Sequence, residues 1–469
     1  MNMTDVFWAM VIATILLLAG KYIRAATPLF QRLYLPSAII AGLLALLLGP
    51  EALGRVVRLV WHEDAPLAGG VFSETILSIW SSVPGLLISV VFAGLFVGKS
   101  IAPPRTIWRE AGPMVVHGQF IAWGQYVVGL SLAIWLLYPV WGTDPLAGAL
   151  IEISFEGGHG TAAGLADTFR ELGFESGADL ALGLATIGVV AGVLLGTLLV
   201  NWAVRKGHIT PPDEQTASEQ EQMAEHDQRE IVQAHERAAR HLIDPLSVHL
   251  GYLGAAIGLG WLLHRGLMWI ERITWVAAGG PELMRHIPLF PLAMLGGVCI
   301  QLLLDRTGRG ARIDRQLINR ISGAALDLLI VTALGTLSLA AIGAEFGPFV
   351  VLALAGTAWN LLAFFWLAPR LLGKDWVPYG LANFGQCMGM TVIGLLLIRM
   401  TDPHNRTGAM HSFGYKQLLF EPVVGGGLFT AASLPLIYEF GAGPILILTA
   451  IVMFAWLGLG WWQYMGHKR

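Results

Sequence analysis

Long apolar stretches separated by short polar segments follow one another along nearly the whole chain. A helix needs about 20 mostly apolar residues to cross the hydrocarbon core of a bilayer. Eleven stretches approach or exceed this length, and they predict membrane-spanning helices at 5–22, 34–49, 76–98, 112–138, 177–203, 245–265, 287–304, 322–343, 347–368, 417–438 and 443–464. The pattern therefore predicts an all-α polytopic membrane protein.

The composition supports this prediction and excludes several classes of function. Hydrophobic residues make up 55% of the 469 residues and charged residues 13%, whereas a soluble protein carries about 25% charged residues. A net charge of −3 offers no basic surface for nucleic acid. The phosphate-binding motif of ATP-driven pumps and the motifs of hydrolases are absent. We therefore expect no enzyme activity, no cofactor and no nucleic-acid partner, and contact with membrane lipid.

Two further apolar stretches, at about 144–166 and 376–398, are interrupted by glycine and polar residues. Backbone that departs from helix geometry is tolerated at membrane depth only where it is buried in protein or lines a cavity. We therefore predict that each stretch is a re-entrant hairpin, which returns to the side of the membrane from which it entered.

The distribution of basic residues predicts the orientation, because cytoplasmic loops carry an excess of Lys and Arg. With the N-terminus outside and both hairpins re-entrant, most of the 29 basic residues, Lys416 among them, fall in cytoplasmic loops. If either hairpin crossed the membrane, every later loop would change side and the asymmetry would largely vanish. The prediction is eleven spans and two re-entrant hairpins, with the C-terminus in the cytoplasm.

Short sequence similarities relate the two halves of the chain. Residues 33–42 resemble 286–296, residues 86–91 resemble 328–333, and residues 155–160 resemble 384–389. Because each half contains five spans, the second half enters the membrane in the opposite orientation, as in the inverted repeats of secondary transporters. This predicts a first membrane repeat at 1–204, a charged cytoplasmic linker at 205–244, a second repeat at 245–440 and an extra C-terminal transmembrane helix at 441–469. The linker is either a solvated helix or a regulatory helix that binds a partner.

Glycines and polar residues of the two hairpins are the candidate substrate-binding residues. Glycine lets the backbone approach a ligand closely, and the free N–H groups of a helix end attract a carboxylate. The first hairpin contributes Ser154, Gly157, Gly158, His159, Gly160 and Thr161, and the second contributes Asn383, Gly385, Gln386, Gly389, Thr391 and Arg399. Arg399 could pair with a substrate carboxylate. The alternatives are that the glycines serve only close helix packing, that a backbone carbonyl satisfies His159, and that Arg399 is a cytoplasmic anchor.

Acidic residues at membrane depth are candidates for ion coupling, because an intramembrane charge is costly unless it has a function. Four acids lie in or beside apolar stretches, namely Glu152, Glu156, Asp327 and Glu421. Glu156 is the first choice, since it lies within the first hairpin. Asp327 is the second, with pairing to Arg320 as the alternative.

The run 144–161, which ends in Gly157-Gly-His-Gly-Thr161, resembles the sodium/glutamate symporters of bacteria, as do Gly173-Phe174 and residues 185–188. The resemblance covers most of 5–440. It implies a secondary transporter with two five-helix inverted repeats and two re-entrant hairpins. It also implies a homodimer in the bacterial inner membrane that takes up glutamate together with Na⁺.

Of three departures from the family pattern, two bear on the coupling ion. Cys387 and Val392 stand where the family's second hairpin has glycine and proline, and Glu156 stands where a small hydroxyl residue is usual. The linker and the last span lie outside the shared pattern. The residues of a sodium site are not identified, and a carboxylate at membrane depth could carry H⁺ instead. The other hypotheses are an exchanger of another small organic anion and, from a different class, a channel or membrane receptor.

Overall fold

A computed structural model describes residues 2–33, 35–99, 101–209, 245–310, 313–389 and 391–465. Within these residues the protein consists of helices and connecting turns, with no strand. Most of the predicted charged linker, residues 210–244, lies outside the described residues.

Ten helices of the described part are long and apolar enough to cross a membrane. They are α1 (Met3–Ala26), α3 continued by α4 (Ser37–Val60), α5 (Glu74–Ala93), α6 continued by α7 (Pro104–Trp141), α11 (Gly177–Arg205), α13 (Pro245–Glu271), α14 (Leu289–Arg306), α15 (Arg315–Gly335), α17 (Phe346–Trp366) and α23 (Ala442–Gly460). Short helices α2 (Pro28–Arg32), α10 (Ala166–Glu171), α16 (Leu339–Ala344) and α18 (Ala368–Leu371) connect them. The prediction of a polytopic, all-helical membrane protein is confirmed.

Polar capping residues extend some helices beyond the apolar stretch that predicted them. The stretch at 322–343 corresponds to α15, which begins at Arg315. The carboxylate of Asp314 accepts hydrogen bonds from the backbone N–H groups of Gln316 and Leu317, at 2.8 and 3.2 Å. This cap satisfies two N–H groups that have no partner within the helix.

Each of the two glycine-rich stretches is divided into short helices. The first broken helix (145–164) consists of a 3-10 turn (Pro145–Ala149), α8 (Leu150–Phe155) and α9 (Gly158–Gly164). The second broken helix (376–401) consists of α19 (Trp376–Gln386) and α20 (Thr391–Thr401). Glycines with positive φ lie at both interruptions, Gly158 at +69° and Gly389 at +141°. Only glycine adopts such angles without strain.

The predicted continuous helix at 417–438 is wrong. The chain forms α21 (Ala409–Phe420) and α22 (Leu428–Phe440), and residues 421–427 between them are not helical. Pro422 cannot donate a helical hydrogen bond, and Gly425 and Gly426 have φ of +72° and +96°. Hydropathy did not detect this third broken helix (409–440), because proline and glycine break a helix without lowering the mean hydropathy of the stretch enough to show it.

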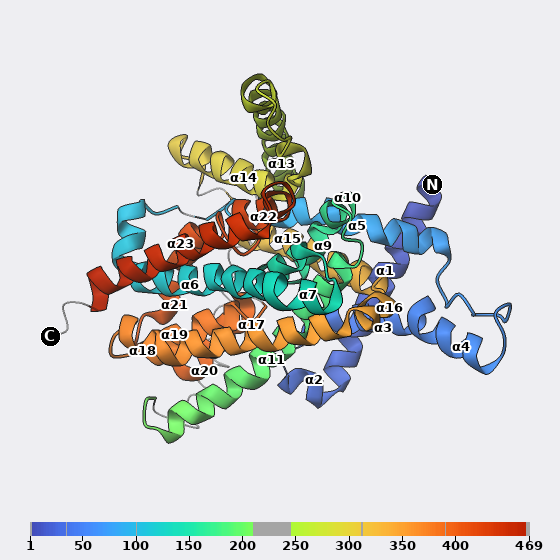
Figure 1. Ribbon diagram of the computed structural model, residues 1–469, viewed down its shortest axis with the longest axis horizontal. Helices are drawn as coiled ribbons and strands as arrows, with labels where there is room; N and C mark the ends of the chain where they lie inside the picture. Colours follow the sequence, from blue (N-terminus) through green and yellow to red (C-terminus); the bar gives the residue numbers. More distant parts are fainter. Residues whose placement is uncertain are drawn as a thin grey trace.

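Helices α6 and α11 place the broken helices next to each other. Helix α6 runs through the middle of the molecule, with α17, α21 and α23 packed along it (Figure 1). Helix α11 contacts α8 and α9 of the first broken helix and α19 and α20 of the second. Helix α3 packs between α1 and α15, while α13 and α14 pack against each other and extend from one side of the molecule (Figure 1).

Candidate functional site

The tips of the first and second broken helices are in contact. A Cβ atom at Gly158 would lie 2.6 Å from the carbonyl oxygen of Gly389, so only glycine fits there. The thiol of Cys387 donates to Oε1 of Glu156 at 3.4 Å. A Cβ atom at Gly188 of α11 would lie 2.6 Å from the carbonyl oxygen of Met388. The two interruptions and α11 therefore form one buried contact, which we call the tip contact.

Two amide side chains hold the second tip in place. Gln125 of α6 and Asn360 of α17 both donate to the carbonyl oxygen of Cys387, at 3.0 and 2.7 Å. Gln125 also donates to Oδ1 of Asn360 at 3.1 Å. These bonds satisfy a carbonyl that lost its helical partner where the helix ends.

Glu152 is fully buried and its carboxylate is fully hydrogen-bonded. Its Oε2 accepts from the hydroxyl of Tyr126 at 2.5 Å. Its Oε1 accepts from the Thr430 hydroxyl at 2.9 Å and from the Gly425 N–H at 2.8 Å. Glu152 thus ties α8 to α6 and to the third broken helix, which is a structural role.

Glu156, one helical turn further on, is in a different situation. Its side chain is buried, and apart from the weak bond from the Cys387 thiol, its second oxygen, Oε2, has no hydrogen-bond partner. A buried polar group without a partner is costly and calls for an explanation such as a bound ion. The oxygen of Glu156 therefore suits a cation or a proton at the tip contact.

Other buried polar atoms without a partner lie in and beside the two broken helices. Among the described residues, eight buried side-chain nitrogen or oxygen atoms have no hydrogen-bond partner, and six of them are Gln125 Oε1, Ser154 Oγ, Glu156 Oε2, His159 Nδ1, Thr161 Oγ1 and Asn383 Oδ1. Five of these six are oxygen atoms, the element that coordinates Na⁺ in interrupted membrane helices. Oxygen atoms of this kind suit a small cation or the hydrogen-bonding groups of a polar substrate.

His159 forms a hydrogen bond with a hydroxyl group, whereas the alternative prediction was a hydrogen bond with a backbone carbonyl. Its Nε2 lies 3.0 Å from Oγ1 of Thr186, and this hydroxyl donates to the carbonyl oxygen of Leu182. The hydroxyl proton is used in that bond, so Nε2 is the donor and Nδ1 carries a free lone pair. His159 thus presents an acceptor rather than a donor to any ligand at Nδ1.

Comparison with known proteins assigns this arrangement to a family. The sequence pattern described as "Sodium/glutamate symporter" matches residues 113–392, which include both tips. The chain belongs to the sodium/glutamate symporter family. A sodium/glutamate symporter of Haemophilus influenzae is 24% identical over 401 residues, which cover 81% of this chain and 91% of that protein. One of Escherichia coli is 27% identical over 214 residues, which cover 45% of this chain and 47% of that protein.

Not all the glycines predicted for the sodium/glutamate symporter site face the tip contact. A Cβ atom at Gly385 would lie 2.7 Å from the backbone nitrogen of Gly394, where α19 and α20 approach each other. A Cβ atom at Gly160 would lie 3.1 Å from the side chain of Ile88 on α5. At these two positions the alternative prediction, close helix packing, describes the contacts.

The polar residues of the second broken helix are engaged with α6 and α21. The amide of Asn383 donates to the carbonyl oxygen of Met114 and to Nδ1 of His117, at 3.1 and 2.9 Å. Gln386 exchanges two hydrogen bonds with Gln417 of α21, at 3.1 and 2.9 Å. The second broken helix is thereby fixed to the third.

Lys416 is a buried residue that the sequence analysis placed wrongly in a cytoplasmic loop. Its side chain is fully buried, and its Nζ donates to Oε1 of Gln386 at 2.9 Å. In the sequence, only one feature pointed to the burial of Lys416, namely its position at the edge of an apolar stretch, four residues before Phe420. Such a position is usual for a loop lysine, so the pattern could not reveal its burial.

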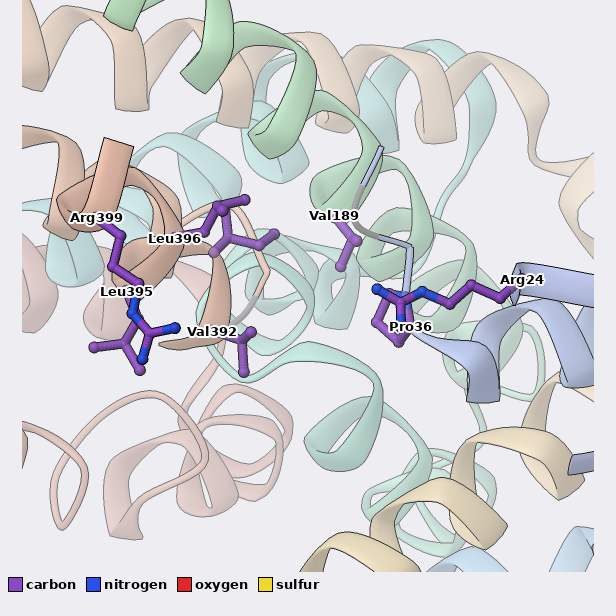
Figure 2. Close-up of a pocket in the computed structure, with 8 residues that line it drawn as sticks. Arg24, Pro36, Val189, Val392, Leu395, Leu396 and Arg399 are labelled. Atoms are coloured by element: carbon purple, nitrogen blue, oxygen red, sulfur yellow. The ribbon is translucent and has the colours of Figure 1, made fainter. Parts of the chain in front are cut away.

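Arg399 and Asp327 take no part in the hydrogen bonds of the tip contact. Arg399 is exposed on α20 and lines a cavity of about 310 Å³ together with Arg24 of α1. Figure 2 shows the two arginines on opposite sides of this cavity, with Val392 and Val189 between them. Asp327 is half-buried on α15, and within the described residues it forms no ion pair with Arg320.

Proposed function

We propose that the protein is a secondary active transporter that takes up glutamate, or a similar small dicarboxylate, together with sodium. The observation that supports this most is the tip contact, where the glycine backbones of the two interruptions meet and Glu156 has a buried oxygen atom without a partner. Glycine exposes backbone N–H groups to a carboxylate. Partnerless oxygens favour a cation beside it.

Each group of residues has a proposed role. Ser154, Thr161 and Asn383 hydrogen-bond the polar groups of the substrate, and Gly157, Gly158 and Gly389 allow the backbone of the two tips to approach it closely. Glu156 provides negative charge for the coupling cation, since its Oε2 has no other partner. Arg399 and Arg24 attract an anionic substrate to the cavity beside the second broken helix, because arginine pairs well with carboxylates.

The proposed membrane arrangement follows the sequence. The two halves form inverted repeats, each with one re-entrant hairpin, and the substrate binds between the two hairpins. The N-terminus lies outside and the C-terminus in the cytoplasm, in a bacterial inner membrane, and two copies form a homodimer. Alternating access in such proteins moves one part of the repeat structure against the other.

Uptake by proteoliposomes tests the proposed function. The purified protein is reconstituted, and accumulation of labelled glutamate is measured with an inward Na⁺ gradient, an inward H⁺ gradient or neither. We expect saturable accumulation with the Na⁺ gradient, and no accumulation with the H⁺ gradient or without a gradient. Glutarate, malate and glutamine as competitors identify the substrate class.

Proton coupling is the second candidate, because a buried carboxylate such as Glu156 can carry H⁺. Accumulation that follows the H⁺ gradient and ignores Na⁺ would establish it and reject sodium coupling. Non-saturable flux that never exceeds equilibrium would indicate a channel, and exchange that needs substrate inside the vesicles would indicate an exchanger.

A further inference from the structure

Lys416 of α21 is a buried cation without a carboxylate in direct contact. Its side chain has 0% exposure, and its Nζ lies 3.9 Å from the centre of the Phe420 ring. Beyond the bond to Gln386, it forms no ion pair within the described residues. Burial of an ammonium group is costly unless an anion compensates its charge.

The packing of α6 leaves space for this ammonium group. A Cβ atom at Gly118 would lie 2.8 Å from Nζ and 2.5 Å from Cε of Lys416. The amide oxygen of Gln386 also accepts from Gln417, so it is held towards Lys416 from two sides. The position of the charge is therefore fixed by three helices, α6, α19 and α21.

Two consecutive residues of the second tip connect Lys416 to Glu156. Gln386 accepts from Lys416 at 2.9 Å, and Cys387 donates to Glu156 at 3.4 Å. Each of the two charges acts electrostatically on the other. One positive and one negative side chain thus contact adjacent residues of the second tip, and within the described residues they form no ion pair with each other.

We propose that Lys416 binds the carboxylate of the substrate, and that the Lys416–Glu156 pair couples substrate binding to cation binding. In the empty site the two charges compensate each other. A cation bound at Glu156 leaves the charge of Lys416 uncompensated, and a substrate carboxylate then restores neutrality. By linkage, the carboxylate strengthens cation binding by the same factor.

This inference rests on the proposed function, and sodium-dependent glutamate binding tests both. The dissociation constant of glutamate is measured for purified protein in nanodiscs, with Na⁺ varied against choline at constant ionic strength. For the wild type we expect Na⁺ to tighten glutamate binding at least tenfold, within the usual range of about 5–150-fold for coupled sites. Lys416→Met is expected to weaken glutamate binding more than tenfold at saturating Na⁺.

The double variant Glu156→Gln/Lys416→Met separates coupling from folding. It removes both charges, so neither is left buried without compensation, and we expect residual glutamate binding to be independent of Na⁺. Gly118→Ala, which displaces Nζ, is expected to weaken glutamate binding as well. The matched control is Lys99→Met, which removes another lysine beside a phenylalanine ring, 5.6 Å from the centre of Phe96, and is expected to leave binding unchanged.

The outcomes distinguish the two proposals. Wild-type glutamate affinity and an unchanged Na⁺ effect in Lys416→Met would overturn the inference. So would a full Na⁺ effect in the double variant, which decides the question if Lys416→Met does not fold. A wild type that binds no glutamate, or binds it equally with and without Na⁺, would instead contradict the proposed function.

Discussion

Glu152 and Glu156 are one helical turn apart, and both are buried, yet their surroundings differ. Tyr126, Thr430 and Gly425 satisfy Glu152 completely. Glu156 receives only a weak bond from a thiol, and its Oε2 has none. A carboxylate that is already satisfied has little to gain from a ligand, so Glu156 is the residue that we expect to respond to the coupling ion.

Replacement of Glu156 tests this assignment. Glu156→Gln keeps the shape of the side chain and removes its charge, so we expect the variant to bind Na⁺ more weakly and to need more Na⁺ for glutamate uptake. The measurement is the Na⁺ concentration for half-maximal uptake in proteoliposomes, which we expect to rise at least tenfold. Full uptake with unchanged Na⁺ dependence would remove Glu156 from the mechanism.

Tyr126→Phe tests the structural role of Glu152. The change leaves a buried carboxylate oxygen without its donor, which costs about 1–3 kcal/mol. We expect a lower unfolding temperature in detergent, and little change in the Na⁺ dependence of uptake by the protein that remains folded. Tyr138→Phe, at an exposed tyrosine, is the control and should leave the unfolding temperature unchanged.

Sequence alone predicted part of this residue-level description. Glu156 was singled out because an acid in a glycine-rich apolar stretch is unusual. Lys416 was not singled out, because its burial depends on Gly118 of α6, Gln386 of α19 and Phe420 of α21. These residues come together only when the chain folds. Residue patterns show where a charge is unusual, but they do not show which side chains surround it.

At the scale of elements, the glycine content predicted where two helices are interrupted. Gly158 and Gly389 lie at the two interruptions with positive φ. The third interruption, at 421–427, was missed because Pro422 and the glycines after it lie in a stretch whose mean hydropathy is high. It nonetheless contributes to the site region, since a Cβ atom at Gly426 would lie 2.5 Å from Oγ1 of Thr161.

Gly158→Ala tests whether the two tips must touch. The added methyl group meets the carbonyl oxygen of Gly389 at 2.6 Å, so the tips must separate, and we expect uptake to fall more than tenfold. Gly142→Ala is the matched control, because Gly142 has a φ of +70° against +69° for Gly158 and has nothing within 4 Å of the added atom. Equal losses in both variants would show that backbone strain, rather than the contact between tips, causes the effect.

For the whole molecule, hydropathy predicted eleven spanning helices, ten of which correspond to long helices of the structure, but it did not predict how the segments meet. Glu156 and Cys387 are 231 residues apart in sequence and share a hydrogen bond. The similarity between 155–160 and 384–389 suggested that both tips belong to one site, whereas the contact itself depends on α11 packing against both. Long-range packing of this kind leaves no local pattern.

The proposed orientation predicts which loops a membrane-impermeant reagent reaches. In a Cys299→Ser background, Glu63→Cys is expected to react in intact cells, because the loop after α4 is proposed to lie outside. Arg105→Cys, at the start of α6, is expected to react only after the membrane is permeabilised. Both native side chains are exposed in the structure. The reverse pattern of labelling would invert the proposed topology.

Direct measurement of sodium flux tests the central claim most directly. Proteoliposomes with equal Na⁺ on both sides receive an inward glutamate gradient, and entry of radioactive Na⁺ is followed. If both ions cross on the same carrier, glutamate drives net Na⁺ entry in the wild type, and Glu156→Gln reduces the Na⁺ that enters per glutamate. Glutamate entry without any accompanying Na⁺ would contradict sodium-coupled transport by this protein.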